Sequence, residues 1–122
     1  MADRGLVLFA HGARDPRWAE PFAALAGLIR AQQPDIRVTL AFLDHLAPDL
    51  AGALQEQARH GVRRVRIVPL FFGRGGHLRD DFPAVLASAR ASVPDLEIEL
   101  TEAAGESVAV QQALATFALD GL

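Results

Sequence analysis

The chain has 122 residues, of which 51% are hydrophobic, and a formal net charge of −3, so it is expected to form one domain over residues 1–122 and not to bind nucleic acid. No apolar run approaches the roughly 20 residues of a membrane-spanning helix, and the polar first residues are unlike a signal peptide, so we expect a cytoplasmic protein with no membrane partner. Cysteine, lysine and tyrosine are absent, which excludes thiolate catalysis, Schiff-base lysines and P-loops, and leaves histidine, carboxylate and arginine chemistry.

Four strand-then-helix units follow one another along the chain. Near-continuous apolar runs predict buried parallel strands, and apolar residues at helical spacing follow each run. In the first helix this stripe begins at Trp18 and Phe22, which are expected in the core. In the third, Asp80 or Asp81 is expected as N-cap, with Pro83 in the first turn. Strands are predicted over residues 5–10, 36–42, 65–72 and 96–101, and helices over residues 17–33, 49–60, 81–92 and 107–118.

The alternation of strands and helices predicts an α/β fold. We expect three layers, in which an open parallel four-stranded sheet in the flavodoxin-like order 2-1-3-4 carries helices on both faces. This order makes the first and third strands neighbours at the switch point, outside whose carboxyl ends such sheets bind ligands.

Two histidines lie just past the ends of these neighbouring strands. His11 follows the first strand and precedes Gly12, and His77 follows the glycine-rich turn that leaves the third strand. Because neighbouring strands are about 4.8 Å apart, both imidazoles can reach one metal ion or carry protons at one site. The alternative for each is structural: a loop histidine bonded to the backbone for His11, and a helix cap for His77.

Carboxylates and a third histidine follow the other strands at the same edge. Asp44 and His45 come after the second strand, and Glu102 and Glu106 after the fourth. Asp44 is a candidate base, although aspartate after a strand also forms turns.

The two histidine loops also carry arginines and aromatic residues. Arg14, Arg17, Arg74 and Arg79 suit a ligand rich in carboxylates or phosphates, or pair locally with Asp15 and Asp80. Gly75 and Gly76 allow a ligand to approach the backbone closely. Phe71 and Phe72 can stack on a flat ligand, but the core is the more common place for aromatic residues at a strand end.

Three segments in this order resemble the CbiX/SirB-type sirohydrochlorin chelatases. Residues 9–16, FAHGARDP, are similar to an HGSRDP-like signature, and residues 68–83 to a P-x-F-L…G-x-H…D-I-P pattern. Between them, AFLD at residues 41–44 with Pro48 resembles a segment that usually reads AFLE…P, so Asp44 stands where glutamate is usual.

The resemblance implies a class II chelatase fold and a lyase, a cobaltochelatase or ferrochelatase, that inserts a divalent metal into sirohydrochlorin in cobalamin or sirohaem biosynthesis. It implies His11 and His77 as metal ligands, which would also accept protons from the tetrapyrrole. The metal is substrate, and no organic cofactor is expected. Since imidazole binds Co²⁺, Fe²⁺ and Ni²⁺ alike, the residues do not choose among them.

A homodimer is expected, because one rim of loops covers only one side of a flat tetrapyrrole and the last helix has more apolar residues than one buried face needs. Two other functions stay open. One is a tetrapyrrole or metal carrier without turnover. The other is a phosphohistidine phosphatase using His11. As a separate alternative, the chain is a paralogue that has kept the fold and lost the activity.

Overall fold

The computed structural model describes residues 3–73 and 76–122, with the backbone alone for residues 76–80. Its centre is a parallel sheet of four strands in the order β2-β1-β3-β4, which confirms the predicted fold class and order. The strands are β1 (Arg4–Ala10), β2 (Arg37–Phe42), β3 (Arg64–Pro69) and β4 (Glu97–Leu100).

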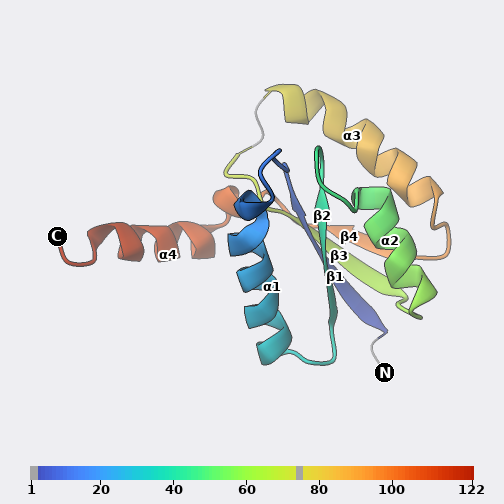
Figure 1. Cartoon of the computed structure of the whole chain (residues 1–122), viewed down its shortest axis with the longest axis horizontal. Helices are drawn as coiled ribbons and strands as arrows, with labels where there is room; N and C mark the ends of the chain where they lie inside the picture. Colours follow the sequence, from blue (N-terminus) through green and yellow to red (C-terminus); the bar gives the residue numbers. More distant parts are fainter. Residues whose placement is uncertain (1–2, 74–75) are drawn as a thin grey trace.

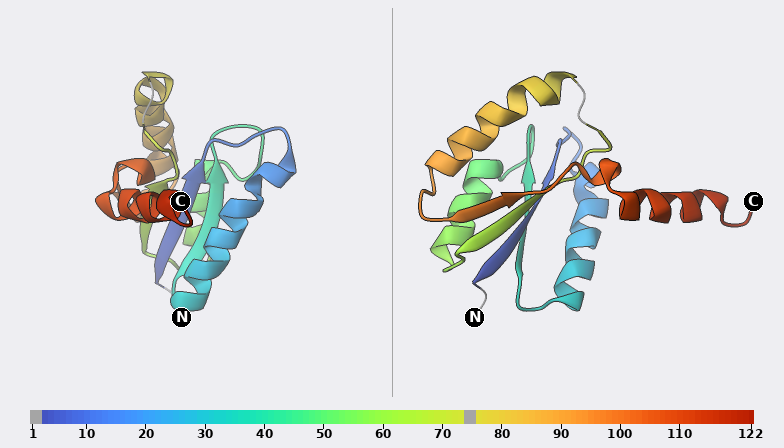
Figure 2. Two further views of the ribbon diagram at one scale, coloured as in Figure 1. Left: turned by 90° about the vertical axis from the view of Figure 1, so that its left-hand side faces the viewer. Right: turned by 180° about the vertical axis from the view of Figure 1, so that it is seen from behind.

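Three helices cover the two faces of this sheet (Figures 1 and 2). On one face, α1 (Glu20–Gln32) packs over β1 and β2, with Leu8, Ala26 and Val38 buried between them. On the other face lie α2 (Leu50–Arg59) and α3 (Gly76–Ala91), over a larger core that includes Phe9, Leu54 and Ile67. The residues of β1 alternate between these cores, as expected for a strand covered on both sides.

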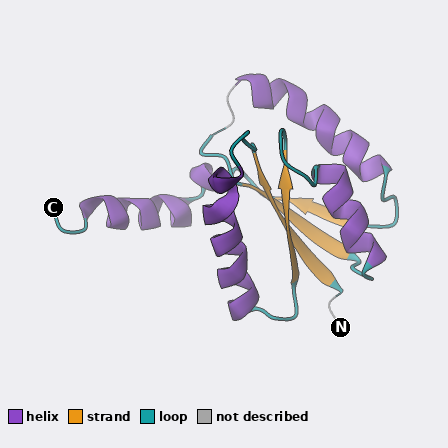
Figure 3. Ribbon diagram, viewed as in Figure 1, coloured by secondary structure: helices purple, strands orange, loops and turns teal. Residues whose placement is uncertain are grey.

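The last helix, α4 (Val108–Leu119), stands away from the sheet (Figure 3). It follows the short turn η2 (Ala104–Glu106), and none of its residues is buried. Within the described residues, no helix therefore lies over the α1 face of β3 and β4. This face carries two exposed ion pairs, Arg64–Glu97 at 2.9 Å and Arg66–Glu99 at 3.2 Å. No helix among the described residues has both the length and the apolar character needed to cross a membrane.

Prolines account for two differences from the predicted boundaries. Residues 16–19 form a 3-10 turn, η1 (Pro16–Ala19), and α1 begins only at Glu20, with proline in its first turn. β3 ends at Pro69, because proline has no N–H to continue the ladder.

The predicted start of α3 is wrong. The helix begins at Gly76, so neither Asp80 nor Asp81 is its N-cap, and Pro83 lies inside it. A missing N–H removes one hydrogen bond from a helix but does not prevent the turns on either side.

Candidate functional site

His11 is the first residue after β1, on the rim formed by the carboxyl ends of the strands. Its side chain is exposed. The backbone around it is held by the β2 loop: the Leu43 N–H donates to the Ala10 carbonyl and the Asp44 N–H to the His11 carbonyl, both at 2.9 Å. The pairing of β1 with β2 thus continues past both strands, and the position of His11 is set by the sheet.

Gly12 permits the close approach of these two loops. Its φ of +90° lies in the left-handed region, and a Cβ there would overlap the carbonyl oxygen of Asp44. A side chain at this position would push the β1 and β2 loops apart.

The imidazole of His11 packs against the ring of Phe71, with centroids 4.4 Å apart and planes at 50°. Phe71 is buried, as expected, and meets Phe9 edge-on at 5.8 Å. The expectation that Phe72 lies in the core is wrong, since it is 74% exposed. Phe71 lies in the same core as Val65 and Ile67, so Phe72 falls on the opposite side of the chain, outside that core.

The importance of Phe71 to His11 was not predicted, although a signal for it existed. Phe9 is paired with Pro69 in the register of β1 and β3, and two residues further along each strand are His11 and Phe71. Strand order combined with register therefore predicts the contact, whereas strand order alone does not.

His77 lies in the first turn of α3, and its side chain is outside the described residues. Phe82, further along α3, stacks on Phe9 at 5.5 Å, so this part of the helix packs on β1. Of the other predicted ligand-binding residues, Gly76 opens α3, and Arg74, Gly75 and the side chain of Arg79 are outside the described part. The meeting of His77 with His11 stays a prediction.

Asp44 contacts the His11 loop through its backbone. Its carboxylate is exposed and, among the described residues, has no hydrogen bond or ion pair. The neighbouring His45 has a φ of 68°, and Glu102 is exposed beyond β4. No three histidine or carboxylate side chains within the described residues are close enough together to hold a metal ion.

The two arginines of the His11 loop differ in their contacts, because Asp15 pairs with Arg17 and not with Arg14. Its carboxylate caps η1 and accepts from Nε and Nη2 of Arg17, the latter at 2.7 Å. These hydrogen bonds lower the pKa of the Asp15 carboxyl. Arg14 is exposed and forms no ion pair within the described residues, so its guanidinium is available to an anionic ligand.

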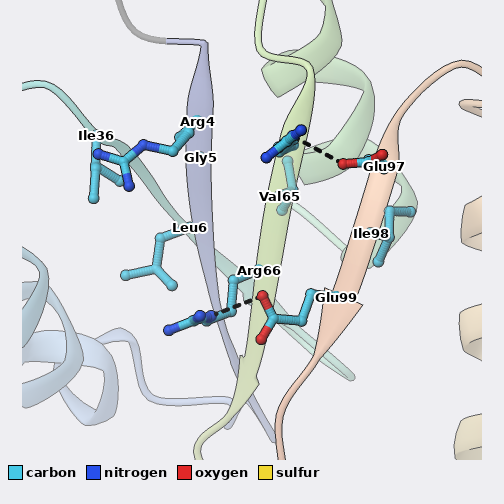
Figure 4. A pocket seen from close by; sticks show the side chains of 10 residues that line it. Arg4, Gly5, Leu6, Ile36, Val65, Arg66, Glu97, Ile98 and Glu99 are labelled. Carbon is cyan, nitrogen blue, oxygen red and sulfur yellow. Dashed lines mark hydrogen bonds and ion pairs between the residues drawn. The ribbon is translucent and has the colours of Figure 1, made fainter.

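The hollow shown in Figure 4, of about 540 Å³, is at the other end of the sheet. It is lined by residues at the beginning of the strands, such as Arg4, Arg64 and Glu97. Sheets of this type bind ligands at the carboxyl ends of their strands, so the rim around His11 remains the candidate site.

Comparison with known proteins assigns the family. The CbiX family profile matches residues 5–118. Sirohydrochlorin cobaltochelatase of Methanothermobacter thermautotrophicus is 32% identical over 82 residues, 67% of this chain and 57% of that protein. The enzyme of the same name from Methanosarcina barkeri is 27% identical over 95 residues, 78% of this chain and 73% of that protein. The first of these alignments thus spans less than two thirds of the relative.

Solved structures share the fold. A CbiX protein from Marinobacter aquaeolei superposes with a TM-score of 0.80 and 29% identity, over 94% of this chain and 93% of that one. The sirohydrochlorin chelatase SirB from Bacillus subtilis subspecies spizizenii, in complex with cobalt, has a TM-score of 0.79 and 21% identity, over 99% of this chain and 51% of that one. With the profile matched from the first strand to the last helix, the chain belongs to the CbiX family.

Proposed function

We propose that residues 1–122 act as one chelatase domain that inserts cobalt or iron into sirohydrochlorin. The observation that carries the proposal is an exposed histidine, His11, held at the end of β1 in a chain whose family match extends over residues 5–118. Of the three metals expected from the sequence, we propose cobalt and iron but not nickel. Curated relatives are named cobaltochelatases, and SirB structures contain cobalt or Fe³⁺.

His11 and His77 are the proposed metal ligands and proton acceptors. Insertion of a divalent ion releases two pyrrole N–H protons while the ion exchanges its waters for ring nitrogens. A neutral imidazole can bind the ion through one nitrogen or accept one of these protons. Two histidines leave most coordination positions open, so the ion can leave for the macrocycle, unlike the ion of a closed structural site. The exposed carboxylate of Asp44 is proposed as an assisting base.

We propose that sirohydrochlorin is recognised by arginine side chains and by one exposed aromatic ring. Sirohydrochlorin carries many carboxylates, and the unpaired Arg14 can bind one with its planar fork. Arg74 and Arg79, with the backbone at Gly75 and Gly76, belong to the same proposal. Phe72, 74% exposed beside the ring that supports His11, can stack on the macrocycle.

An anaerobic absorbance assay with sirohydrochlorin and Co²⁺ or Fe²⁺ tests the activity. His11→Ala and His77→Ala are each expected to lower the insertion rate by about a hundredfold or more, because groups that bind the metal or move a proton act in the reaction itself. His60→Ala is the control: this histidine caps the far end of α2, where its Nδ1 lies 2.9 Å from the Glu56 carbonyl.

Each alternative gives a different result. A histidine variant with near wild-type rate removes that residue from the site. Stoichiometric binding of sirohydrochlorin or metal without turnover supports a carrier. Phosphate release from a generic phosphomonoester supports a phosphatase.

We also propose that two chains form a two-fold dimer with their rims facing one shared cavity. The support is α4, whose exposed apolar side chains include Leu114, 42% exposed, and Phe117, 78% exposed. The helix leaves the rim through η2, where the Gly105 N–H donates to the Phe71 carbonyl at 2.9 Å. A second copy packed on α4 would therefore lie next to the rim.

Light scattering at micromolar concentration tests this arrangement. The wild-type chain is expected to be a dimer, and Phe117→Asp to be monomeric because a charge on the apolar helix opposes burial. Gln112→Glu, which adds a charge at a polar position of the same helix, serves as the control. A wild-type monomer that inserts metal at full rate contradicts the shared cavity but not the role of His11.

A further inference from the structure

We propose that Phe71 is a positioning residue for His11, a proposal that rests on the proposed function of this site. The Phe71 ring is 3% exposed and lies under the imidazole, with centroids 4.4 Å apart. Contact between two rings at this distance restricts rotation about the side-chain bonds of His11. Phe71 therefore sets the plane in which the imidazole meets a metal ion and a pyrrole nitrogen.

Phe71, which lies beneath His11, is itself held by two elements, β1 and η2. The Phe71 ring meets Phe9 edge-on at 68°. The residue before it, Leu70, donates its N–H to the Phe9 carbonyl at 2.7 Å. The Phe71 carbonyl accepts the N–H of Gly105, where a Cβ would overlap the backbone of Phe72. Because β1 and η2 both hold Phe71, its ring has little freedom to move.

An aromatic support suits a histidine that must transfer its metal. Metal-binding histidines usually donate their second ring N–H to a carboxylate or carbonyl, which fixes the ring and makes it a stronger ligand. His11 makes no such hydrogen bond within the described residues, and its ring contact there is with Phe71. Packing thus orients the imidazole and leaves its unprotonated nitrogen free to bind the ion or, once the ion has left, to accept a proton.

Nuclear magnetic resonance tests the contact without any activity. In the wild-type protein, nuclear Overhauser effects are expected between the ring protons of His11 and Phe71, and the His11 signals should carry the ring-current shift of the phenyl group. Phe71→Leu should remove that shift. Val65→Ala, which truncates a buried residue of β3, should leave it unchanged. Absence of the Overhauser effects, or His11 signals that do not move in Phe71→Leu, would overturn the proposal.

The insertion assay tests the consequence. Phe71→Leu is expected to lower kcat by about ten- to a hundredfold, because a misplacement of about 1 Å costs up to a hundredfold in rate. The KM for sirohydrochlorin should change little, since Phe71 is buried beneath the site. Phe71→Tyr keeps the ring and should restore most of the rate, whereas Val65→Ala should behave as wild type.

The two assays separate this proposal from the proposed function. Equal loss of kcat in Phe71→Leu and Val65→Ala contradicts positioning, because it points to a general effect of core truncation. Failure of the wild-type protein to insert metal contradicts the proposed function, while the magnetic resonance result still decides whether Phe71 orients His11.

Discussion

Replacement of Gly12 by alanine should damage the site and the fold together. This glycine combines a left-handed φ of +90° with a position at which the carbonyl oxygen of Asp44 occupies the space that a Cβ would need. A methyl group there must push the His11 loop away from the β2 loop. This movement should lengthen or break the hydrogen bond from the Asp44 N–H to the His11 carbonyl, which is 2.9 Å long.

The cost has two parts. A left-handed backbone costs a residue with a Cβ about 1–2 kcal/mol. Loss of the hydrogen bond between the two loops adds about 0.5–1.5 kcal/mol, so the free energy of unfolding should fall by about 1.5–3.5 kcal/mol in total. Gly61 is a matched control, because its φ is +85° and nothing lies within 4 Å of a Cβ built on it. Gly61→Ala should incur only the backbone cost of about 1–2 kcal/mol.

Urea unfolding followed by circular dichroism gives both free energies, and the insertion assay gives both rates. Gly12→Ala should be the less stable variant and should lose most of its insertion activity, because His11 is displaced. Gly61→Ala should keep a near wild-type rate. If the two variants are equally stable and equally active, the contact between the His11 and Asp44 loops does not hold His11 in place.

Three further predictions concern side chains around the site and in the core. Asp44→Ala should change the unfolding free energy by less than about 0.5 kcal/mol in a urea titration, because the contacts of Asp44 are made by its backbone. It should also lower the insertion rate far less than His11→Ala, and an equal loss would make the carboxylate essential. Gln57→Ala should lower stability by about 2–4 kcal/mol, because this fully buried side chain fills the core and donates to Thr39 Oγ1 at 2.9 Å. Gly5→Ala should lower the unfolding free energy less in the Gln57→Ala protein than in wild type, because the Gln57 amide that its Cβ would overlap is gone. If the two losses of stability are additive, Gly5 and Gln57 are not in contact. The hydrogen bonds from Arg17 lower the pKa of Asp15, so their stabilising effect is present above its ordinary value of 3.8 and is lost as the pH falls through the lowered pKa. A carboxyl titration by magnetic resonance should therefore give a lower midpoint in wild type than in Arg17→Gln, and equal midpoints would rule out the pair in solution.

The sheet and the place of His11 were predictable because they follow from local pattern and topology. Apolar runs of strand length separated by helical stripes permit few arrangements once crossovers are right-handed. The order 2-1-3-4 then places the end of β1 beside the end of β3, where Phe71 and the loop to α3 begin. Residue type and position were enough to select His11 as a candidate.

The roles of particular side chains at the rim were less predictable. Phe71 and Phe72 are adjacent and identical in type, yet one is buried under His11 and the other is 74% exposed. Asp44 was selected for its carboxylate, whereas the structure shows its backbone N–H and carbonyl against the His11 loop. Both outcomes depend on which neighbouring segments lie against these residues, and the periodicity of one segment does not report its neighbours.

The sequence by itself determined the α/β class and the exit of β1 as the place for histidine chemistry, because hydrophobic period and glycine position are local properties. The flavodoxin-like strand order was an expectation for this class, which the structure confirmed. The tertiary structure decided the contacts among segments distant in the chain. These are His11 on Phe71, Gly12 against Asp44, and Gly105 against Phe72. It also decided that α4 leaves the sheet, although its apolar composition suits a buried helix. The α1 face of β3 and β4 carries Arg–Glu ion pairs. An apolar helix packed over them would remove the hydration of these charges and offer no polar groups in its place, which is energetically unfavourable.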